Sequence, residues 1–368
     1  MASAHVYGGG FVTGATRHFK LIGSLEEGDW GSLTFERNFP GVYHPIGREN
    51  WDLNKVKDVN FLVVNPPCAP FSTIGSRKGH DDPRFEFTKN CFSLGLELRP
   101  EVFALESVCR AWSAANLFYS AMAEKFMRLG YGVTILLTNG ILHNGFQHRE
   151  RFHFIAHRGE LELETPKIRS VASVGDVIGD LEETARFTDE EPLIANHVVR
   201  RPRGLENNVL ELLEEGEGYN RAVERLEMLT GEKAGRWRLL AKRLKWDEPC
   251  STIADLSSLF HPHANRQLTL REGARLCGYP DSFVVHEDPK FTTHNGRQED
   301  LTQAVLPNMG EYLAKLALSS LGNGLALDEL RVVDWRKIGR KFRGSSEGCG
   351  EEIKRERREE RKREPLAA

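Results

Sequence analysis

The sequence predicts an α/β fold in which a mostly parallel sheet carries helices on both faces. Six short apolar segments in the first 160 residues are typical of buried strands, and segments with helical periodicity separate them. Strands that alternate with helices favour a parallel sheet, because each crossover helix covers one of its faces. With 368 residues the chain has room for one large domain or two modest ones.

The predicted strands follow one another along the first part of the chain. In chain order they span 3–7, 19–25, 60–64, 102–105, 132–137 and 152–156. The third is continuously apolar from Phe61 to Val64, as expected of a strand that is covered on both faces. Helical periodicity is clear over 85–98 and 114–129.

The remainder of the chain changes character three times. Residues 1–160 form the first predicted unit. Residues 161–245 are rich in Glu and Arg and poor in strand-like runs, which favours a second, smaller domain. Residues 246–335 are compact again, with helices expected at 268–277 and 310–321. Residues 336–368 carry nearly balanced charges and almost nothing apolar, so we expect a disordered tail.

Composition narrows the class of protein. No apolar run approaches the roughly 20 residues of a membrane span, and the N-terminus lacks the basic and apolar regions of a secretory signal. The six cysteines show no paired spacing, so we expect a reducing, cytoplasmic location, no disulfide framework and no cysteine-based metal site. A net charge of -3 excludes a uniformly basic coat for nucleic acid but allows a local basic cleft.

A glycine-rich turn follows the first predicted strand. Gly8, Gly9, Gly10 and Phe11 precede a helix expected near residue 13, and such a turn lets a backbone approach a ligand closely. Glu26 follows the second strand, where nucleotide-binding folds place a carboxylate that accepts hydrogen bonds from ribose hydroxyls.

A cysteine lies on a stiff loop directly after the third strand. Three prolines in the run Asn65-Pro-Pro-Cys-Ala-Pro70 restrict this loop, and Cys68 lies at the carboxyl end of a parallel strand, where such folds bind ligands. Glu106 leaves the fourth strand at the same edge, where burial can raise its pKa and let it donate a proton. The alternatives are a cysteine that only fills the core and a glutamate that caps a helix.

Polar side chains also lead into the sixth strand. If this segment is extended, Gln147, Arg149 and Arg151 share one face, which suits a carboxylate, a phosphate or a base edge. Nearby, His153 and His157 would lie roughly 13 Å apart on a strand. They cannot share one metal ion, and we expect no metal site.

These motifs, in this order, resemble the DNA (cytosine-5)-methyltransferase family. NPPCAPFS is similar to its nucleophile loop, LESV to its ENV motif, and QHRER to its QxRxR motif. GGGF with Glu26 resembles its cofactor turn and following acid, and EPCSTI, RQLTLRE and QAVLP, between residues 248 and 307, resemble its last two blocks. The resemblance covers about 1–160 and 245–325, with departures at His5, Tyr7, Ala69, Ser107 and Gln303.

The resemblance implies a Rossmann-like catalytic domain, a target-recognition domain over 161–245, and a monomer that acts on double-stranded DNA without a metal. Its methyl donor would be S-adenosylmethionine. By the same resemblance Cys68 adds to C6 of a flipped-out cytosine, Glu106 assists at N3, Arg151 holds O2 and Arg149 supports the site. The implied cofactor-binding residues are Gly8, Gly9, Gly10, Phe11, Glu26, Asp52, Pro67 and Val305. The implied DNA-binding residues are Gln147, Arg200, Arg201, Arg203, Arg236 and Arg238.

Three other functions stay open from the sequence. One branch of the same family acts on tRNA, although the sizeable middle segment favours DNA. A catalytically inactive DNA-binding homologue would not need the Cys68 and Glu106 that this chain retains. The altered glycine turn also leaves open the transfer of a group other than methyl.

Overall fold

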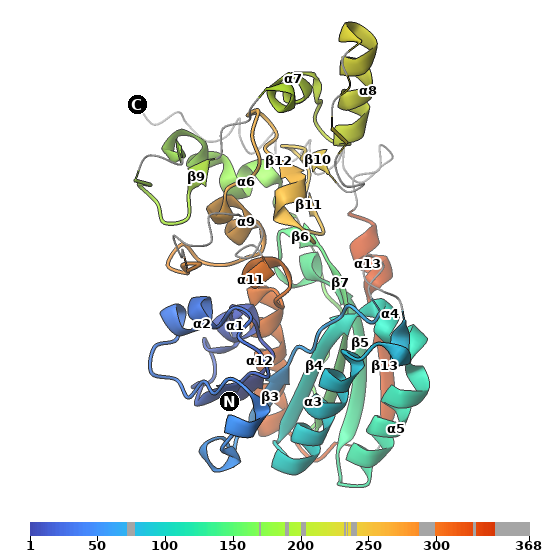
Figure 1. Ribbon diagram of the computed structural model, residues 1–368. Coiled ribbons are helices and arrows are strands. Elements are labelled where there is room, and N and C mark those ends of the chain that lie inside the picture. Colours follow the sequence, from blue (N-terminus) through green and yellow to red (C-terminus); the bar gives the residue numbers. More distant parts are fainter. Residues whose placement is uncertain are drawn as a thin grey trace, which may run out of the picture.

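The structure is a computed structural model that describes residues 1–71, 78–168, 171–187, 191–199, 204–231, 233, 235–236, 241–286, 299–326 and 329–342. Its helices and strands form two lobes, which lie one above the other in Figure 1. The lower lobe contains the main sheet. The upper lobe contains the elements from α6 (Val174–Ile178) to α9 (Leu270–Leu276).

Seven strands form the main sheet, in the order β13-β5-β7-β4-β3-β1-β2. They are β1 (Ala2–Ala4), β2 (Gly23–Leu25), β3 (Phe61–Val64), β4 (Val102–Val108), β5 (Gly132–Asn139), β7 (Glu150–His157) and β13 (Leu330–Asp334). β7 runs antiparallel to β4 and β5, whereas the other neighbours are parallel. The predicted mostly parallel sheet is confirmed. β13 was not among the predicted strands, and its residues are only exposed or half-buried because it lies at the edge.

Helices cover both faces of the sheet, as predicted. On one face, α3 (Phe85–Leu98) and α5 (Asn116–Met127) share an apolar core with β4 and β7. On the other, α1 (Gly10–Ala15) and α12 (Pro307–Gly322) pack against alternate residues of the same strands. The remaining helices of the lower lobe are α2 (Ser32–Asn38), α4 (Cys109–Ala114), α11 (Glu299–Thr302) and α13 (Arg336–Arg340).

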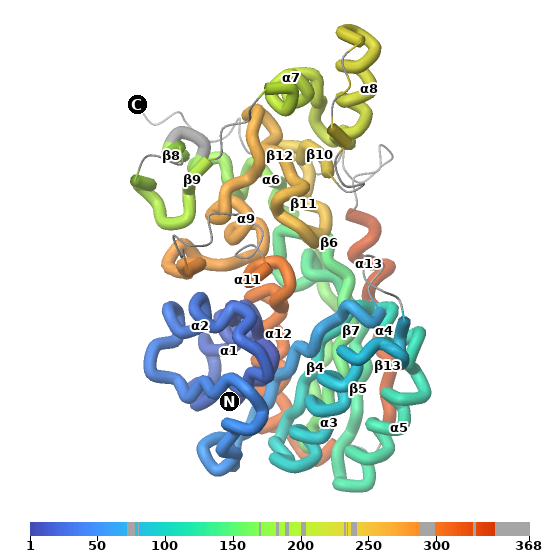
Figure 2. The backbone as a smooth tube through the Cα atoms, viewed as in Figure 1, coloured from blue at the N-terminus to red at the C-terminus, as the bar shows by residue number. Residues whose placement is uncertain are grey.

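α1 and α12 approach each other so closely that both need glycine at the contact. A Cβ on Gly14 would lie 1.8 Å from the carbonyl oxygen of Pro307, and one on Gly310 would lie 2.1 Å from that of Phe11. Figure 2 shows the course of the chain, in which α12 returns from the upper lobe and runs beside α1. The lower lobe is therefore completed by a segment some 300 residues away from α1 in the sequence.

Short elements build the upper lobe. β6 (Gln147–His148) pairs with β11 (Cys250–Ser251), β8 (Arg186–Phe187) with β9 (Val198–Val199), and β10 (Lys242–Arg243) with β12 (Leu259–Phe260). α7 (Leu205–Leu212) and α8 (Tyr219–Thr230) form a small core of their own with Phe260.

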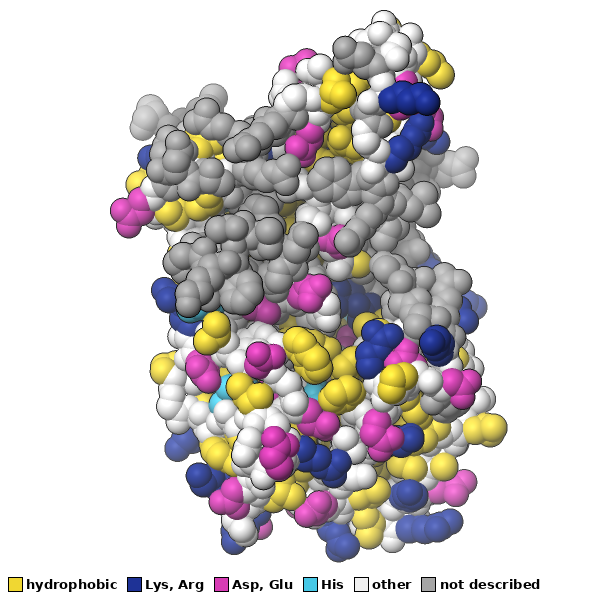
Figure 3. Space-filling model, in the orientation of Figure 1, with side chains coloured by type: hydrophobic (Ala, Val, Ile, Leu, Met, Phe, Trp, Pro, Cys, Tyr) yellow, Lys and Arg dark blue, Asp and Glu magenta, His cyan; other side chains and the backbone are white. Residues whose placement is uncertain are grey.

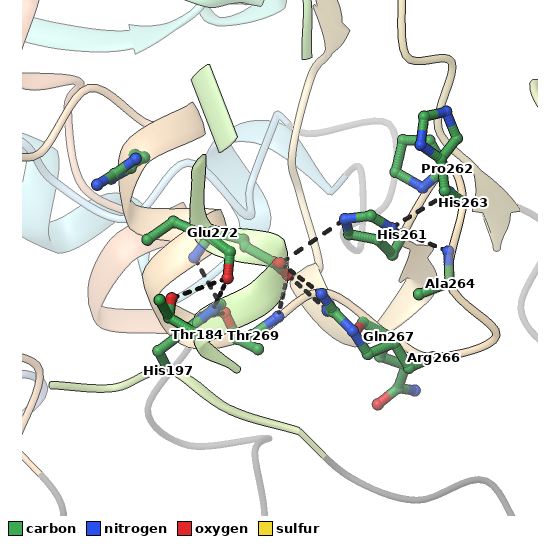
Figure 4. A network of polar contacts seen from close by, with 12 residues as sticks. Thr184, His197, His261, Pro262, His263, Ala264, Arg266, Gln267, Thr269 and Glu272 are labelled. Atoms are coloured by element: carbon green, nitrogen blue, oxygen red, sulfur yellow. Dashed lines mark hydrogen bonds and ion pairs between the residues drawn. The ribbon is translucent and has the colours of Figure 1, made fainter. Parts of the chain in front are cut away.

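A buried polar network ties the upper lobe together. Figure 4 shows His261, Arg266 and Thr269 gathered around the carboxylate of Glu272. The Arg266 guanidinium donates to both Glu272 oxygens, at 2.8 and 2.7 Å, and the backbone N–H of Thr269 donates at 2.8 Å. Burial disfavours this carboxylate, but the bonds from Arg266 outweigh it and lower the pKa of Glu272.

The C-terminal segment differs from expectation at its start. Residues 336–340, the first of the predicted tail, form α13, and Trp335 and Gly339 are buried. The backbone carbonyl of Phe342 accepts a 2.8 Å hydrogen bond from Nε2 of His148. Residues 343–368 of that prediction lie outside the described residues.

Across the described ranges, none of the helices combines the length and the hydropathy needed to cross a bilayer.

Candidate active site

The predicted catalytic residues follow neighbouring strands at one edge of the sheet. In the order β4-β3-β1-β2, β4 carries Glu106 near its end, β3 leads to Cys68, and β2 leads to Glu26. The carboxyl ends of parallel strands meet at one edge, so these side chains converge. That edge faces the upper lobe, as the position of α4 directly after β4 shows in Figure 1.

Glu106 lies at the centre of a buried hydrogen-bonded group. It is 3% exposed, accepts a 2.7 Å hydrogen bond from Nδ2 of Asn65 at one oxygen, and has Nε of Arg151 2.8 Å from the other. Burial raises the pKa of Glu106, and the charges of Arg151 and Arg149 only partly oppose this. The acid form is therefore more accessible here than in an ordinary glutamate, as a proton donor requires.

Cys68 is a free, partly exposed thiol on the loop after β3. The loop is tied back by hydrogen bonds from the N–H of Phe71 to the Cys68 carbonyl and from the N–H of Gly79 to the Pro70 carbonyl, both 3.0 Å. The charges of Cys68 and Glu106 both act on Tyr7 and on Arg149, as expected of two residues that share one site.

Two members of this site were missed by the sequence analysis. Asn65 belongs to the proline loop, and its position beside Glu106 follows from the pairing of Val64 with Leu105. That register could have suggested the contact. Arg84, whose charge acts on Cys68 and which pairs with Asp82, lies 16 residues further along and carries no local signal.

Arg149 and Gln147 face the returning chain. Arg149 is 4% exposed, and its guanidinium donates to the carbonyls of Ile253, Thr302 and Ala304 at 3.1, 2.8 and 3.4 Å. Such bonds fit a positioning residue, and burial lowers the pKa of Arg149 to about 10.

Gln147 is fully buried. Its oxygen accepts from the N–H of Ile253 at 3.1 Å, and its amide nitrogen lies 3.3 Å from the Leu276 carbonyl. The prediction that Gln147 contacts DNA does not fit this placement, because the amide is already bonded within the protein. The expectation that residues 147, 149 and 151 present one face to a ligand is therefore corrected for Gln147, whose amide is bonded within the protein.

Glu26 provides the acid expected on the cofactor side. It is 3% exposed, and one oxygen accepts from the N–H of Val6 at 2.9 Å and from the Ser24 hydroxyl at 3.2 Å. Among the described residues its second oxygen has no hydrogen bond. Burial raises the pKa of Glu26 to about 7, with Val6, Ser24 and His5 acting against it. A buried glutamate with one oxygen left without a hydrogen bond in the described part of the chain fits an acceptor for ribose hydroxyls, so this residue suits a nucleoside-containing cofactor.

The glycine turn packs mainly against protein. A Cβ on Gly10 would lie 2.3 Å from the Val305 carbonyl oxygen, and one on Gly8 would lie 2.9 Å from that of Asp300. Gly9 has a φ of 98°, which glycine adopts without strain. Phe11 and Val305 are 0% and 2% exposed. These residues therefore join α1 to the returning segment, and their predicted contacts with a cofactor stay a prediction.

The other predicted binding residues lie closer to the surface. Asp52 is exposed and caps a short helical turn through the N–H of Asn54, and Pro67 is half-buried. Arg236 is exposed and pairs with Glu224 and Glu227 at 2.9 and 3.1 Å. Arg200, Arg201, Arg203 and Arg238 lie outside the described residues.

Three further observations concern surface charge, metal ligands and cavities. On the face drawn in Figure 3, acidic and basic side chains are interspersed over the lower lobe, so no single charge dominates it. In the part of the chain that the structure describes, no group of three His, Cys, Asp or Glu side chains could hold a metal ion. A cavity of about 360 Å³ beside α12, lined by His143, Asn308 and Tyr312 among others, contains none of the predicted site residues.

The sequence matches one family of known proteins over most of its length. That family is described as C-5 cytosine-specific DNA methylase, and the match spans residues 6–317. Among curated relatives, Type II methyltransferase M1.HphI of Haemophilus parahaemolyticus is 27% identical over 330 residues, which cover 84% of each chain. Type II methyltransferase M.MthTI of Methanothermobacter thermautotrophicus is 27% identical over 279 residues, covering 69% of this chain and 78% of that one.

Solved structures share the fold. A DNA modification methyltransferase encoded within an E. coli prophage superposes with a TM-score of 0.65 at 20% identity, covering 88% of this chain and 99% of the other. The Entamoeba histolytica methyltransferase EhMeth gives a TM-score of 0.60 at 11% identity, with 87% and 98% covered.

Proposed function

Because this chain belongs to the C-5 cytosine-specific DNA methylase family and is a DNA cytosine-5 methyltransferase, we propose that it works through a covalent adduct between Cys68 and its target base. The single observation that carries this proposal is the buried group of Asn65, Glu106 and Arg151, which stands beside the loop that presents Cys68.

Cys68 is the proposed nucleophile. C5 of cytosine is too weak a nucleophile to take a methyl group unaided, and addition of a thiolate to C6 makes C5 enamine-like. A partly exposed thiol on a restrained loop is suited to this attack, because the sulfur is accessible while its position is fixed.

Glu106 is the proposed acid at N3 of the cytosine. As the thiolate adds to C6, electron density moves toward N3, and a proton donated by Glu106 stabilises it. Asn65 and Arg151 hold the carboxyl group from two sides and so fix its direction. When C5 has been alkylated, the C5 proton passes to water, the ring regains its double bond and the Cys68 thiolate leaves. The proton on N3 then returns to the Glu106 carboxylate, which restores the acid.

S-adenosylmethionine is the proposed methyl donor. When bound it supplies an electrophilic methyl sulfonium. Glu26 would accept hydrogen bonds from the ribose hydroxyls through its free oxygen, and Trp51, whose indole N–H donates to the Glu26 carbonyl at 3.2 Å, would border the adenosine.

Double-stranded DNA is the proposed substrate. The reacting ring is inaccessible inside a duplex, so the target base must rotate out toward the sheet edge, at a cost of a few kcal/mol. The upper lobe faces this edge and is the part of the chain from which phosphate contacts and base reading are expected.

Mechanism-based trapping tests the proposal. A duplex that carries 5-fluorocytosine cannot lose the C5 substituent, so the wild type with S-adenosylmethionine is expected to form a denaturation-resistant protein–DNA complex on a gel. Cys68→Ser should form none. Cys109→Ser is the matched control, since Cys109 is also a half-buried free thiol but lies at the start of α4. Covalent capture by Cys68→Ser, or loss of capture by Cys109→Ser alone, contradicts the assignment. Parallel incubation with tRNA tests the other nucleic acid.

A further inference from the structure

Tyr7 lies between the two halves of the active site. β1 stands between β3 and β2 in the sheet, and Tyr7 follows β1 by three residues. The loop after β3 presents Cys68, with Glu106 on the next strand, and the loop after β2 presents Glu26. Strand order therefore places Tyr7 between the carboxyl group on the cofactor side and the groups that act on the base.

The electrostatic surroundings of Tyr7 agree with this order. Burial raises the pKa of the Tyr7 hydroxyl, and the charges of Cys68, Glu26 and Glu106 raise it further. One side chain is thus within electrostatic reach of both halves of the site. Its phenol is neutral and occupies volume there without adding a charge.

The backbone of Tyr7 has an unusual conformation that its surroundings maintain. Tyr7 has a φ of 54°, in the left-handed region that glycine adopts freely and bulky side chains rarely enter. The loop cannot easily relax, because Gly31 at the start of α2 approaches it closely. A Cβ on Gly31 would lie 2.6 Å from the carbonyl carbon of Tyr7. A strained backbone that persists at a residue with a bulky side chain points to a functional constraint.

We propose that the ring of Tyr7 limits the size of the group that this enzyme transfers, because it fills the space between the cofactor and the target base. This inference rests on the proposed function, in which the donor is held at Glu26 and the base at Cys68. The C5 electron pair forms the new carbon–carbon bond, the carbon–sulfur bond of the sulfonium breaks, and sulfur keeps the electron pair as a thioether. Methyl and ethyl transfer are the same kind of displacement, and the ethyl reaction is intrinsically slower in every variant, so a change in the ethyl-to-methyl ratio between variants reports the space that Tyr7 leaves.

The test compares donors of different size on three variants. Tyr7→Gly removes the ring and suits the left-handed backbone, Tyr7→Asn does so with a side chain that tolerates that conformation, and Tyr7→Phe keeps the ring while removing the hydroxyl. Without DNA, calorimetric titration measures the dissociation constants of S-adenosylmethionine and S-adenosylethionine. With duplex DNA, mass spectrometry of nucleosides measures ethyl against methyl incorporation in competition.

The wild type and Tyr7→Phe are expected to bind S-adenosylethionine at least tenfold more weakly than S-adenosylmethionine, the range in which one extra methylene is discriminated. Tyr7→Gly and Tyr7→Asn should narrow this ratio below threefold and raise the ethyl-to-methyl ratio by tenfold or more. Unchanged ratios in both variants overturn the proposal, and a shifted ratio in Tyr7→Phe does the same, because the hydroxyl would then be responsible. If the wild type transfers no methyl group to DNA, the proposed function itself fails.

Discussion

Replacing Glu26 by Gln measures what a buried carboxylate contributes to stability at the cofactor side of the site. Burial raises its pKa from an ordinary 4.5 to about 7. Each pKa unit corresponds to about 1.4 kcal/mol, so the ionised form is disfavoured in the folded protein by about 3 kcal/mol relative to the unfolded chain. Glutamine keeps an oxygen acceptor for the N–H of Val6 and never ionises.

The stability that Glu26 contributes depends on pH, because its pKa differs between the folded and the unfolded protein. The folded protein binds the Glu26 proton more tightly than the unfolded chain, so the associated stability is fully present below pH 4.5 and is lost as the pH rises through about 7. Glu26→Gln is therefore expected to match the wild type near pH 4.5 and to be more stable by up to about 3 kcal/mol at pH 8. Urea unfolding at several pH values measures this difference.

Glu27→Gln is the matched control, because the pKa of this neighbouring carboxyl group is shifted in the opposite direction. Burial disfavours its charge, but His5 and Asn90 outweigh this and lower the pKa of Glu27. Removing this charge should destabilise the protein at pH 8. A gap between Glu26→Gln and the wild type that is equal at pH 5 and pH 8, or a Glu26→Gln variant that is less stable at pH 8, refutes the argument.

Three further changes probe the groups around the site. Glu106→Gln should reduce methyl transfer by roughly 100-fold or more while the thermal midpoint stays within a few degrees, and a near wild-type rate would make Glu106 structural only. Arg149→Met leaves the carbonyls of Ile253 and Thr302 without donors and should cost about 2 kcal/mol or more in urea unfolding, whereas unchanged stability would contradict its linking role. Glu272→Gln leaves Arg266 buried without its partner and should cost about 3 kcal/mol at pH 7. Because the pKa of Glu272 is lowered, that deficit should shrink as the pH falls below 4.5.

Local signals were enough to predict much of the lower lobe. The apolar run from Phe61 to Val64 is a strand because both of its faces are covered, and the helical periodicity over 85–98 coincides with α3. The convergence of Cys68, Glu26 and Glu106 followed from one rule, that parallel strands end at the same edge. Each of these features depends on residues close together in the chain.

Long-range contacts account for what the sequence did not reveal. Gln147 was expected to face DNA, but its amide bonds to Ile253 and Leu276, more than 100 residues away, and no local pattern encodes such partners. The glycine turn was expected to approach a ligand, which stays a prediction, and the close approach of Gly10 to the carbonyl of Val305 was not foreseen. In both cases the missing information was which distant segment packs there.

Arg149 depends on carbonyl partners that are made much later in the chain, and this affects when the active site can form during synthesis. A nascent chain that has emerged only as far as residue 200 already contains Cys68, Glu106 and Arg151. It still lacks Ile253 and Thr302, whose carbonyls hold Arg149, and α12, which packs against α1. The lower lobe can therefore be completed only after α12 has been synthesised. Fragments released before that point are expected to lack methyl transfer.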